Sequence, residues 1–492
     1  MPAAPPGLRM GTGPGRWVIA ATVLGSAVAF IDGTVVNAAL PSLTADLHAD
    51  LAGAQWVVTG YLLSLSALLV IGGSLGDLRG RRRIFVIGLI AFAVTSMLCG
   101  LAPTIEILIL GRVLQGAAAA LLLPSSLAII SATFVQGDRG AAIGAWSGLG
   151  GIAGALGPFL GGWLIQAISW RAVFFINLPL CAVTVWLAWR HVPETRDEEA
   201  DPRLDVVGGL LLAAGLAGIV YGLIEGPAGG WSAPTVVSLV VGGVLLVAWV
   251  VDQARARHPM VPLGLFTSRQ FSGANGTTLF VYAALGAVMF LTVVHLQTDL
   301  GYSPIAAGAS FLPLTLIMLL FSARSGALAQ RIGPRLPMTV GPIVAAAGIL
   351  LLMRVEPGAS YVGVVLPAVL VLGVGLCFTV APLTAAVLGA VDDHHAGIGS
   401  AINNAVARLG SLLAVAVLPA AAGLAGPDGS LDLSSGFGRA MAITAALAAV
   451  GGAIAFVTVR KAEPVVTIVH GNIGDPCFAP CVRTASDEPE AA

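Results

Sequence analysis

Two charged side chains lie inside long apolar stretches of this sequence, where a charge is costly. Asp32 is the one acidic residue well within an apolar run, and Arg112 lies inside another run. A charge at the centre of a bilayer costs about 2.5 to 3.5 kcal/mol on insertion scales, and desolvation favours the neutral form of a carboxyl group. Asp32 is therefore expected to bind and release protons near neutral pH. The alternative is an acid that a basic or polar neighbour holds in place for packing.

Arg112 is the counterpart of Asp32, because a guanidinium in a membrane needs a partner or a water-filled cavity. Gln115 and Gly116 share its face of a helix. A helix rises by about 1.5 Å per residue, and on this scale Asp32 and Arg112 reach similar depths, although contact between them is left open. His295 is expected to be a structural histidine. The secondary candidates, which are polar residues within or near spans, are Gln115, Gln297, Asn403 and Arg408.

The elements that must position these residues are transmembrane helices. Hydrophobic residues make up 57% of the chain and charged residues 10%, whereas soluble proteins carry about 25% charged residues. A helix needs about 20 apolar residues to cross a bilayer. The sequence predicts an all-α membrane protein with fourteen such helices, near 17–38, 52–74, 84–102, 105–131, 141–166, 174–190, 206–224, 235–253, 274–297, 305–324, 337–354, 361–388, 397–421 and 438–459.

The distribution of basic residues supports this number of spans, because short cytoplasmic loops are rich in Lys and Arg. With the N-terminus in the cytoplasm, Arg171, Arg354 and Arg439 fall outside the cell, and Arg112 and Arg408 lie within spans. The other basic residues fall on the cytoplasmic side. The sequence therefore predicts a multi-pass protein of a bacterial inner membrane, with both termini in the cytoplasm.

An internal repeat indicates two related halves. Residues 73–82 align with residues 326–335, and each segment follows the second span of a six-span block. The blocks share an orientation, and parallel repeats are typical of two-lobed secondary transporters. The predicted parts are a cytoplasmic N-terminal segment, a six-helix lobe, an acidic connector (a solvated tether) with two extra transmembrane helices, a second six-helix lobe and a disordered cytoplasmic tail, at 1–16, 17–191, 192–273, 274–459 and 460–492.

Four motifs resemble those of the major facilitator superfamily, specifically its fourteen-span drug/proton antiporter branch. Residues 32–41 resemble the first-helix pattern and 112–116 the fourth-helix motif. In the second copy of the repeat, Gln330 replaces an acid. The loop signature between spans two and three is matched at Gly73, Leu75, Asp77, Gly80, Arg81 and Arg82. The antiporter motif of span five is matched at Ala153, where the family has glycine, and at Gly157, Pro158, Gly161 and Gly162.

The resemblance implies a two-lobed helical bundle that alternates between inward-open and outward-open states. It implies that the loop at 73–82 is a cytoplasmic gate, in which Asp77 and Arg81 form and break an ion pair; a plain cytoplasmic anchor is the alternative. It also implies that the span-five motif seals the path against leak. The spacing of Ala153, Gly157 and Gly161 alone predicts a stripe that lets a neighbouring helix approach, which ordinary packing would explain as well.

Missing motifs exclude several chemistries. The only lysine, Lys461, is followed by Ala462, so the chain has no Walker phosphate loop and is not by itself an ATP-driven pump. Neither a His-Glu-x-x-His motif nor metal-ligand spacing of Cys and His occurs. We expect no enzymatic activity, no metal, no cofactor and no nucleic-acid partner. The expected partners are the lipid bilayer, protons and a small-molecule substrate, and the chain is expected to act as a monomer driven by the proton motive force.

These observations predict a proton-coupled antiporter that exports small, mostly hydrophobic compounds such as drugs or antibiotics, with Asp32 exchanging a proton for substrate. The alternatives are an exporter of an endogenous metabolite or lipid, and a membrane receptor that transports nothing. A single acid within the membrane favours neutral or singly cationic compounds over dications. Phe30, Trp56, Trp146 and Phe378 are candidates to line an apolar pocket.

Overall fold

The computed structural model describes residues 7–197, 205–256, 259–391, 396–424, 433 and 436–459. This part of the chain is helical, and its one β-type pairing is an isolated bridge between Leu8 and Phe134. A 3₁₀ turn, η1 (Leu263–Thr267), precedes α10, and a π-helical turn, η2 (Tyr361–Val365), precedes α14. The α-helices are α1 (Gly13–Asp46), α2 (Leu51–Arg79), α3 (Arg81–Gly100), α4 (Ile105–Thr133), α5 (Gln136–Ala167), α6 (Ala172–Phe175), α7 (Asn177–His191), α8 (Val206–Gly229), α9 (Ala233–Arg255), α10 (Arg269–Thr298), α11 (Pro304–Ala309), α12 (Leu312–Ile332), α13 (Arg335–Leu352), α14 (Leu366–Leu388), α15 (Ala396–Ala421) and α16 (Phe437–Thr458).

The described residues contain 14 helical segments that are long and apolar enough to cross a membrane. The predicted number of spans is therefore confirmed. Two spans consist of two helices each, because α6 and α7 share one and α11 and α12 share another. In both, a proline follows the break, Pro179 in α7 and Pro313 in α12. Proline has no N–H to continue the helical hydrogen bonds, which explains why the helix restarts there.

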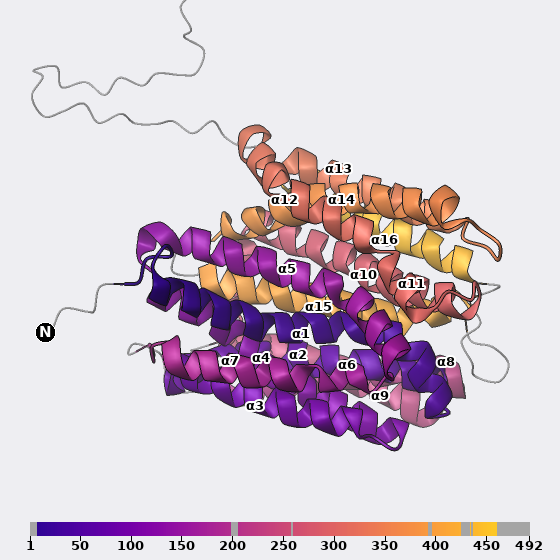
Figure 1. Ribbon diagram of the computed structural model, residues 1–492, viewed down its shortest axis with the longest axis horizontal. Coiled ribbons are helices and arrows are strands. Elements are labelled where there is room, and N and C mark those ends of the chain that lie inside the picture. The colour runs from indigo at the N-terminus through magenta and orange to yellow at the C-terminus, as the bar shows by residue number, and fades with distance from the viewer. Residues whose placement is uncertain are drawn as a thin grey trace, which may run out of the picture.

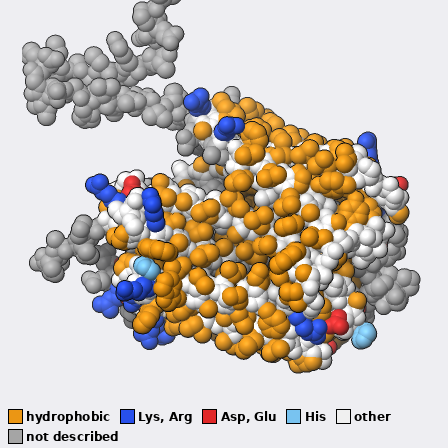
Figure 2. Space-filling model, in the orientation of Figure 1, with side chains coloured by type: hydrophobic (Ala, Val, Ile, Leu, Met, Phe, Trp, Pro, Cys, Tyr) orange, Lys and Arg blue, Asp and Glu red, His pale blue; other side chains and the backbone are white. Residues whose placement is uncertain are grey.

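The flank of the bundle is suited to lipid. Figure 2 shows hydrophobic side chains over this flank, whereas Lys and Arg gather mainly at the end near the N-terminus. Helix α9 exposes Val240, Val244 and Val247 by 60% to 64% each. Contiguous apolar surface of this extent would not be stable in water, so the protein is a multi-pass membrane protein. We call the end that carries 79–83 the basic end.

The helices form two groups, and an extra pair lies beside them. Figure 1 shows α1–α7 mostly on one side of the bundle and α10–α16 mostly on the other. The groups meet where α2 packs on α15, α1 on α10 and α5 on α11. Helix α8 contacts both α2 and α15, and α9 packs on α8. The lobe boundaries at 17–191 and 274–459 remain predictions, and the predicted tail at 460–492 lies outside the described residues.

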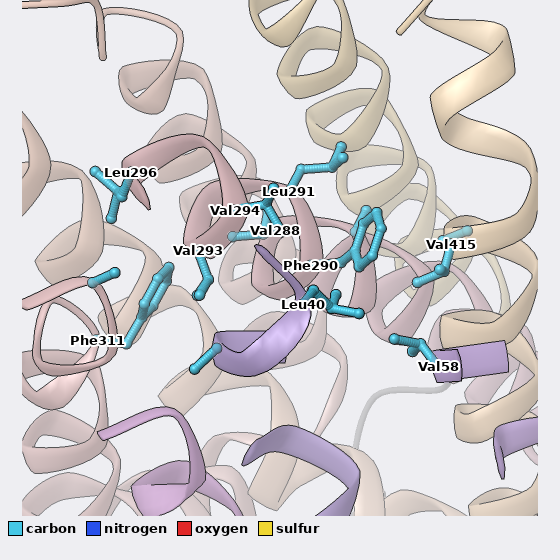
Figure 3. Packing of buried hydrophobic residues seen from close by; sticks show 14 of the residues in the cluster. Leu40, Val58, Val288, Phe290, Leu291, Val293, Val294, Leu296, Phe311 and Val415 are labelled. Carbon is cyan, nitrogen blue, oxygen red and sulfur yellow. The ribbon is translucent and has the colours of Figure 1, made fainter. Parts of the chain in front are cut away.

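The two groups pack tightly at the end of the bundle opposite the basic end. Ten side chains there, from α1, α2, α10, α15 and the junction of α11 and α12, belong to one apolar cluster, and we call these ten the apolar seal (Figure 3). Each of its members is almost fully buried, so these described side chains close the boundary between the groups at this end. The members labelled in the figure are Leu40, Val58, Val288, Phe290, Leu291, Val293, Val294, Leu296, Phe311 and Val415.

The predicted N-terminal segment is tied to the bundle. Helix α1 begins at Gly13, where Thr12 caps it, so it starts before the predicted position. The backbone N–H of Leu8 donates to the carbonyl oxygen of Thr133 at 2.8 Å, and the carbonyl of Leu8 accepts from the N–H of Val135 at 3.1 Å. These bonds fasten the segment to the basic end of α4.

The first residues of the acidic connector, 192–197, lie along the turn between α2 and α3. The carboxylate of Glu194 accepts hydrogen bonds from the backbone N–H groups of Arg82 and Arg83 at 3.0 and 3.1 Å. The N–H of Asp197 donates to a backbone carbonyl of α2 at 3.0 Å. A carboxylate is favourable here because the first N–H groups of a helix have no partner inside it. This stretch is therefore held in place, where a solvated tether was expected.

Candidate functional site

Asp32 and Arg112 form an ion pair in the interior of the bundle. Nη1 of Arg112 lies 2.5 Å from Oδ2 of Asp32, and the two side chains are 1% and 0% exposed. Asp32 comes from the middle of α1, and Arg112 comes from the first half of α4. The contact that the sequence left open is therefore present. Removing one partner of such a buried pair typically costs about 3 to 5 kcal/mol.

The second oxygen of Asp32 is held by two amide side chains. Oδ1 accepts hydrogen bonds from Nε2 of Gln115 on α4 and from Nδ2 of Asn177 on α7, each at 2.9 Å. Both amides also donate to Oγ of Ser96 on α3, at 2.6 and 2.9 Å. Oε1 of Gln115 accepts from Nη1 of Arg112 at 2.6 Å. We call Asp32, Ser96, Arg112, Gln115 and Asn177 the polar cluster.

The polar cluster is shielded from solvent. The guanidinium of Arg112 lies over the ring of Tyr61, 4.3 Å from its centre, and its Nε donates to the carbonyl of Val57 at 3.0 Å. The hydroxyl of Tyr61 donates to the carbonyl of Ala29 at 3.0 Å. All members of the cluster are at most 1% exposed. A proton can therefore reach Asp32 only when the helices around it move.

A cavity of about 390 Å³ reaches from the basic end to the middle of the bundle. Asp77 and Arg81 line it at the basic end, and the rings of Phe30 and Trp146 line it in the middle. The first turns of α15 form the wall from the second half of the chain. Asp32 does not line this cavity, and neither do the other two aromatic candidates. Among the described residues, no group of three or more His, Cys, Asp or Glu is placed to hold a metal ion.

The turn between α2 and α3 contains the ion pair expected there. Nε of Arg81 donates to Oδ1 of Asp77 at 2.7 Å, and both side chains are partly exposed. Gly80 between them has φ +104°, a conformation that side chains rarely adopt. A Cβ on Gly80 would lie 2.8 Å from a carboxylate oxygen of Glu194. Glycine at this position thus permits both the turn and the contact with the connector.

Two further members of the loop motif, Gly73 and Arg82, have packing roles. Gly73 lets α2 approach α4, since a Cβ there would lie 3.3 Å from Cβ of Pro124. Nη1 of Arg82 donates to the carbonyl oxygen of Val192 at 3.1 Å. The loop motif therefore joins α2 to α4 and α3 to the connector.

Glycines on α5 let α1 approach closely. A Cβ on Gly157 would overlap the hydroxyl of Thr34, and a Cβ on Gly161 would lie 2.8 Å from a backbone oxygen of α1. The hydroxyl of Thr34 donates to the carbonyl of Gly154 at 2.7 Å. Ala153 is half-buried on α5. The stripe that faces α1 therefore includes Gly154, which the predicted motif does not contain.

The other two members of the span-five motif, Pro158 and Gly162, face α11. A Cβ on Gly162 would overlap the backbone of Pro304, and a Cβ on Gly308 would overlap the carbonyl of Pro158. The motif thus packs α5 against one helix from each half of the chain. This contact between α5 and α11 also holds the two halves together near the apolar seal.

Gln297 joins the two halves, whereas Asn403 does not. Nε2 of Gln297 on α10 donates to the carbonyl of Ala38 on α1 at 3.1 Å. A matching bond runs from Nε2 of Gln55 on α2 to the carbonyl of Val415 on α15 at 2.7 Å. Asn403 donates to an asparagine and a threonine of α10, within its own half.

His295 has the structural role expected of it. Its Nδ1 lies 2.7 Å from Oδ2 of Asp299, and its Nε2 lies 2.9 Å from the carbonyl oxygen of Val355. Its ring stacks on Phe437 with centres 3.9 Å apart. These contacts join α10 to α16 and to the segment after α13.

The sequence did not reveal four polar residues that form hydrogen bonds between helices. Ser96 and Asn177 complete the polar cluster, and Gln55 bonds to α15. Glu225 lies in a span because α8 continues past its predicted end, and its Oε1 accepts from Nε1 of Trp56 at 2.9 Å. Each is a polar side chain inside or at the edge of an apolar run, and that signal alone could have found them.

Comparison with known proteins shows the family to which this sequence belongs. Residues 22–415 match the model of the Major Facilitator Superfamily. The Tetracenomycin C resistance and export protein of Streptomyces glaucescens is 35% identical over 401 residues, which are 81% of this chain and 74% of the relative. The Puromycin resistance protein of Streptomyces alboniger is 38% identical over 415 residues, which are 83% of this chain and 82% of the relative.

Solved structures have the same fold. The POT family transporter PepTSo superposes with a TM-score of 0.66 at 15% identity, over 90% of this chain and 97% of that one. A bacterial homolog of the human lysosomal transporter Spinster gives a TM-score of 0.63 at 17% identity, over 91% and 97%. The chain, whose described residues form 14 apolar spans in two groups and an extra pair, with a cavity between the groups, belongs to the Major Facilitator Superfamily of membrane transporters.

Proposed function

We propose that this protein is a proton-coupled exporter of small, mostly hydrophobic compounds, antibiotics among them, and that it works by alternating access in a bacterial cell membrane. The two relatives described above are a resistance and export protein and a resistance protein, which supports export of such compounds. The observation that carries the proposal is the buried pair of Asp32 and Arg112 beside a largely apolar cavity.

Helix α1 connects the polar cluster to the cavity. Phe30, two residues before Asp32, lines the cavity, and Thr34, two residues after it, bonds to α5. The negative charge of Asp32 holds α1 against Arg112 of α4 and Asn177 of α7. Protonation of Asp32 removes this charge and weakens the hold. The proton thus changes the position of the helix that carries a substrate-lining residue.

The orientation of the protein in the membrane follows from the distribution of charge. Basic loops remain in the cytoplasm, so the basic end and both termini face the cytoplasm. The cavity then opens inward, and the apolar seal faces outward. Substrate enters from the cytoplasmic side, the seal opens, and a proton that binds Asp32 from outside returns the protein to the inward-open state. This cycle uses the proton motive force, needs neither ATP nor a cofactor, and is complete within a monomer.

Transport by purified protein in liposomes tests this proposal. Efflux of a fluorescent apolar compound should follow an imposed pH gradient and should stop when ionophores collapse both the pH and the voltage gradients. ATP should have no effect. Efflux that continues without either gradient would contradict proton coupling, and uptake in the opposite direction would contradict export.

A further inference from the structure

A second arginine, Arg408, lies beside the cavity, and none of the acids that the structure describes forms an ion pair with it. Arg408 is on α15, one turn beyond Asn404, which lines the cavity. Its guanidinium carbon is 5.8 Å from the centre of the Phe30 ring, and Phe30 lines the cavity too. Its Nε is buried and has no hydrogen-bond partner.

The charges at the middle of the bundle do not balance without a ligand. Asp32 is neutralised by Arg112 and is closed off from the cavity. The titratable groups that interact electrostatically with Arg408 are the hydroxyls of Tyr61 and Tyr282, and tyrosine is uncharged near neutral pH. The excess charge at the inner end of the cavity, in the middle of the bundle, is therefore positive, whereas Asp77, Arg81 and Asp197 line its basic end. A charged side chain within a membrane is costly unless it has a partner, and it marks a functional site.

The contact with Phe30 does not offset the cost of placing the charge of Arg408 inside the membrane. At 5.8 Å the contact is near the outer limit of about 6 Å at which a cation and an aromatic ring attract one another. Arg324 lies at a similar distance, 5.6 Å, from the ring of Phe321, but it is exposed and solvated. A guanidinium has donors in a planar fork that match a carboxylate. The group that best fits Arg408 is therefore an anion such as a carboxylate.

We propose that Arg408 binds the anionic group of the transported compound, and that the preferred substrates are apolar aromatic molecules with one negative charge. Phe30 and Trp146 contact the aromatic part of such a molecule in the cavity. This inference rests on the proposed function for its site. It reverses the preference for neutral or cationic compounds that Asp32 alone predicted, because Arg112 already neutralises that charge.

Three anthracene probes with the same ring and different substituents, a carboxylate, its methyl ester and a methylammonium, separate charge from ring binding. Their equilibrium binding is measured with the full chain in lipid nanodiscs. The wild-type protein should bind the carboxylate about tenfold more tightly than the ester, as expected for one hydrogen-bonded charge pair. Arg408→Gln should lose this preference and bind the ester as the wild type does. Arg408→Lys should keep part of it, and the matched control Arg324→Gln should keep all of it.

Several results would overturn the assignment. These are a wild-type protein that prefers the ammonium or the ester, an Arg408→Gln variant that keeps the preference, or a control that loses it equally. The wild-type comparison needs no variant, so it decides the matter even if Arg408→Gln does not fold. Gradient-driven efflux of the ester by the wild type tests the proposed function separately. Efflux without any anion preference overturns only the role of Arg408, and anion preference without efflux overturns only the transport cycle.

Discussion

Nε2 of Gln55 donates a hydrogen bond to the carbonyl oxygen of Val415, 2.7 Å away in the other half of the bundle. That oxygen has no N–H partner four residues on in α15, because Pro419 occupies the position. Gln297 makes the reciprocal bond, from α10 to a carbonyl of α1 three residues before Pro41. One glutamine from each half therefore bonds to a helix with an internal proline, and both bonds lie at the sealed end.

We expect Gln55→Met to make the sealed end open more often. A neutral hydrogen bond contributes about 0.5 to 1.5 kcal/mol, so opening should become about 2- to 10-fold more frequent. A cysteine placed at Val58, which is 6% exposed in the seal, reports opening through its rate of labelling by a membrane-impermeant maleimide. Gln253→Met removes a buried glutamine far from the seal and should not change the rate. Equal rates in the two variants would contradict a role for Gln55 in closure.

Asp32→Asn should stop gradient-driven efflux and also destabilise the protein. The variant cannot exchange a proton, and it leaves Arg112 buried without its carboxylate, which should cost about 3 to 5 kcal/mol. Thermal unfolding of the detergent-solubilised protein measures this loss. Adding Arg112→Gln removes the unpaired charge and should recover most of the stability but none of the efflux. Normal efflux by Asp32→Asn would exclude this residue as the coupling site.

Gly157→Ala should impair transport, because the added Cβ would overlap the hydroxyl of Thr34 and push α1 away from α5. Gly144→Ala on the same helix is the matched control, since nothing lies within 4 Å of its added Cβ. Efflux rates are compared after membrane abundance is matched. If both variants transport at the wild-type rate, the close approach of α1 and α5 is not required for transport.

Glu194→Ala should lower stability by about 0.5 to 2 kcal/mol, the usual contribution of a side chain that accepts hydrogen bonds at the start of a helix. Its carboxylate binds the N–H groups of Arg82 and Arg83 at the start of α3. Thermal unfolding measures the change, and Glu356→Ala, an exposed acid between α13 and η2, provides the comparison. A loss for Glu194→Ala no larger than that for Glu356→Ala would show that the connector is not held by this residue.

The membrane architecture was predictable from the sequence, because each span is recognised from its own run of apolar residues. The number of spans does not depend on how the helices pack. The breaks between α6 and α7 and between α11 and α12 were not predicted, since each remains apolar and the only local signals are Pro179 and Pro313. Helices α1 and α2 end at Asp46 and Arg79, beyond the apolar runs, because hydropathy marks the part of a helix inside the bilayer and not where the helix ends.

The candidate site was predictable in its charged members and in Gln115, which shares a helix face with Arg112, but not in Ser96 and Asn177. Asp32 and Arg112 are unusual in apolar runs, so residue type alone identified them. Ser96 and Asn177 are small and neutral, cost less to bury and occur on helices for many reasons. Their role depends on three other helices converging on α1, which only the packing reveals. The lack of a partner for Arg408 is likewise a property of the packed bundle.

Helix α8 packs on both α2 and α15, so it lies across the boundary between the two moving halves. Glu225 bonds to Trp56 of α2 through a side-chain hydrogen bond, whereas α15 meets α8 along an apolar groove lined by Val417 and Trp231. In the proposed cycle, α8 cannot keep both contacts when the sealed ends of α2 and α15 separate, and the apolar one is the easier to release into lipid. A gap between α8 and α15 would then let an apolar molecule leave directly into the outer leaflet without crossing water.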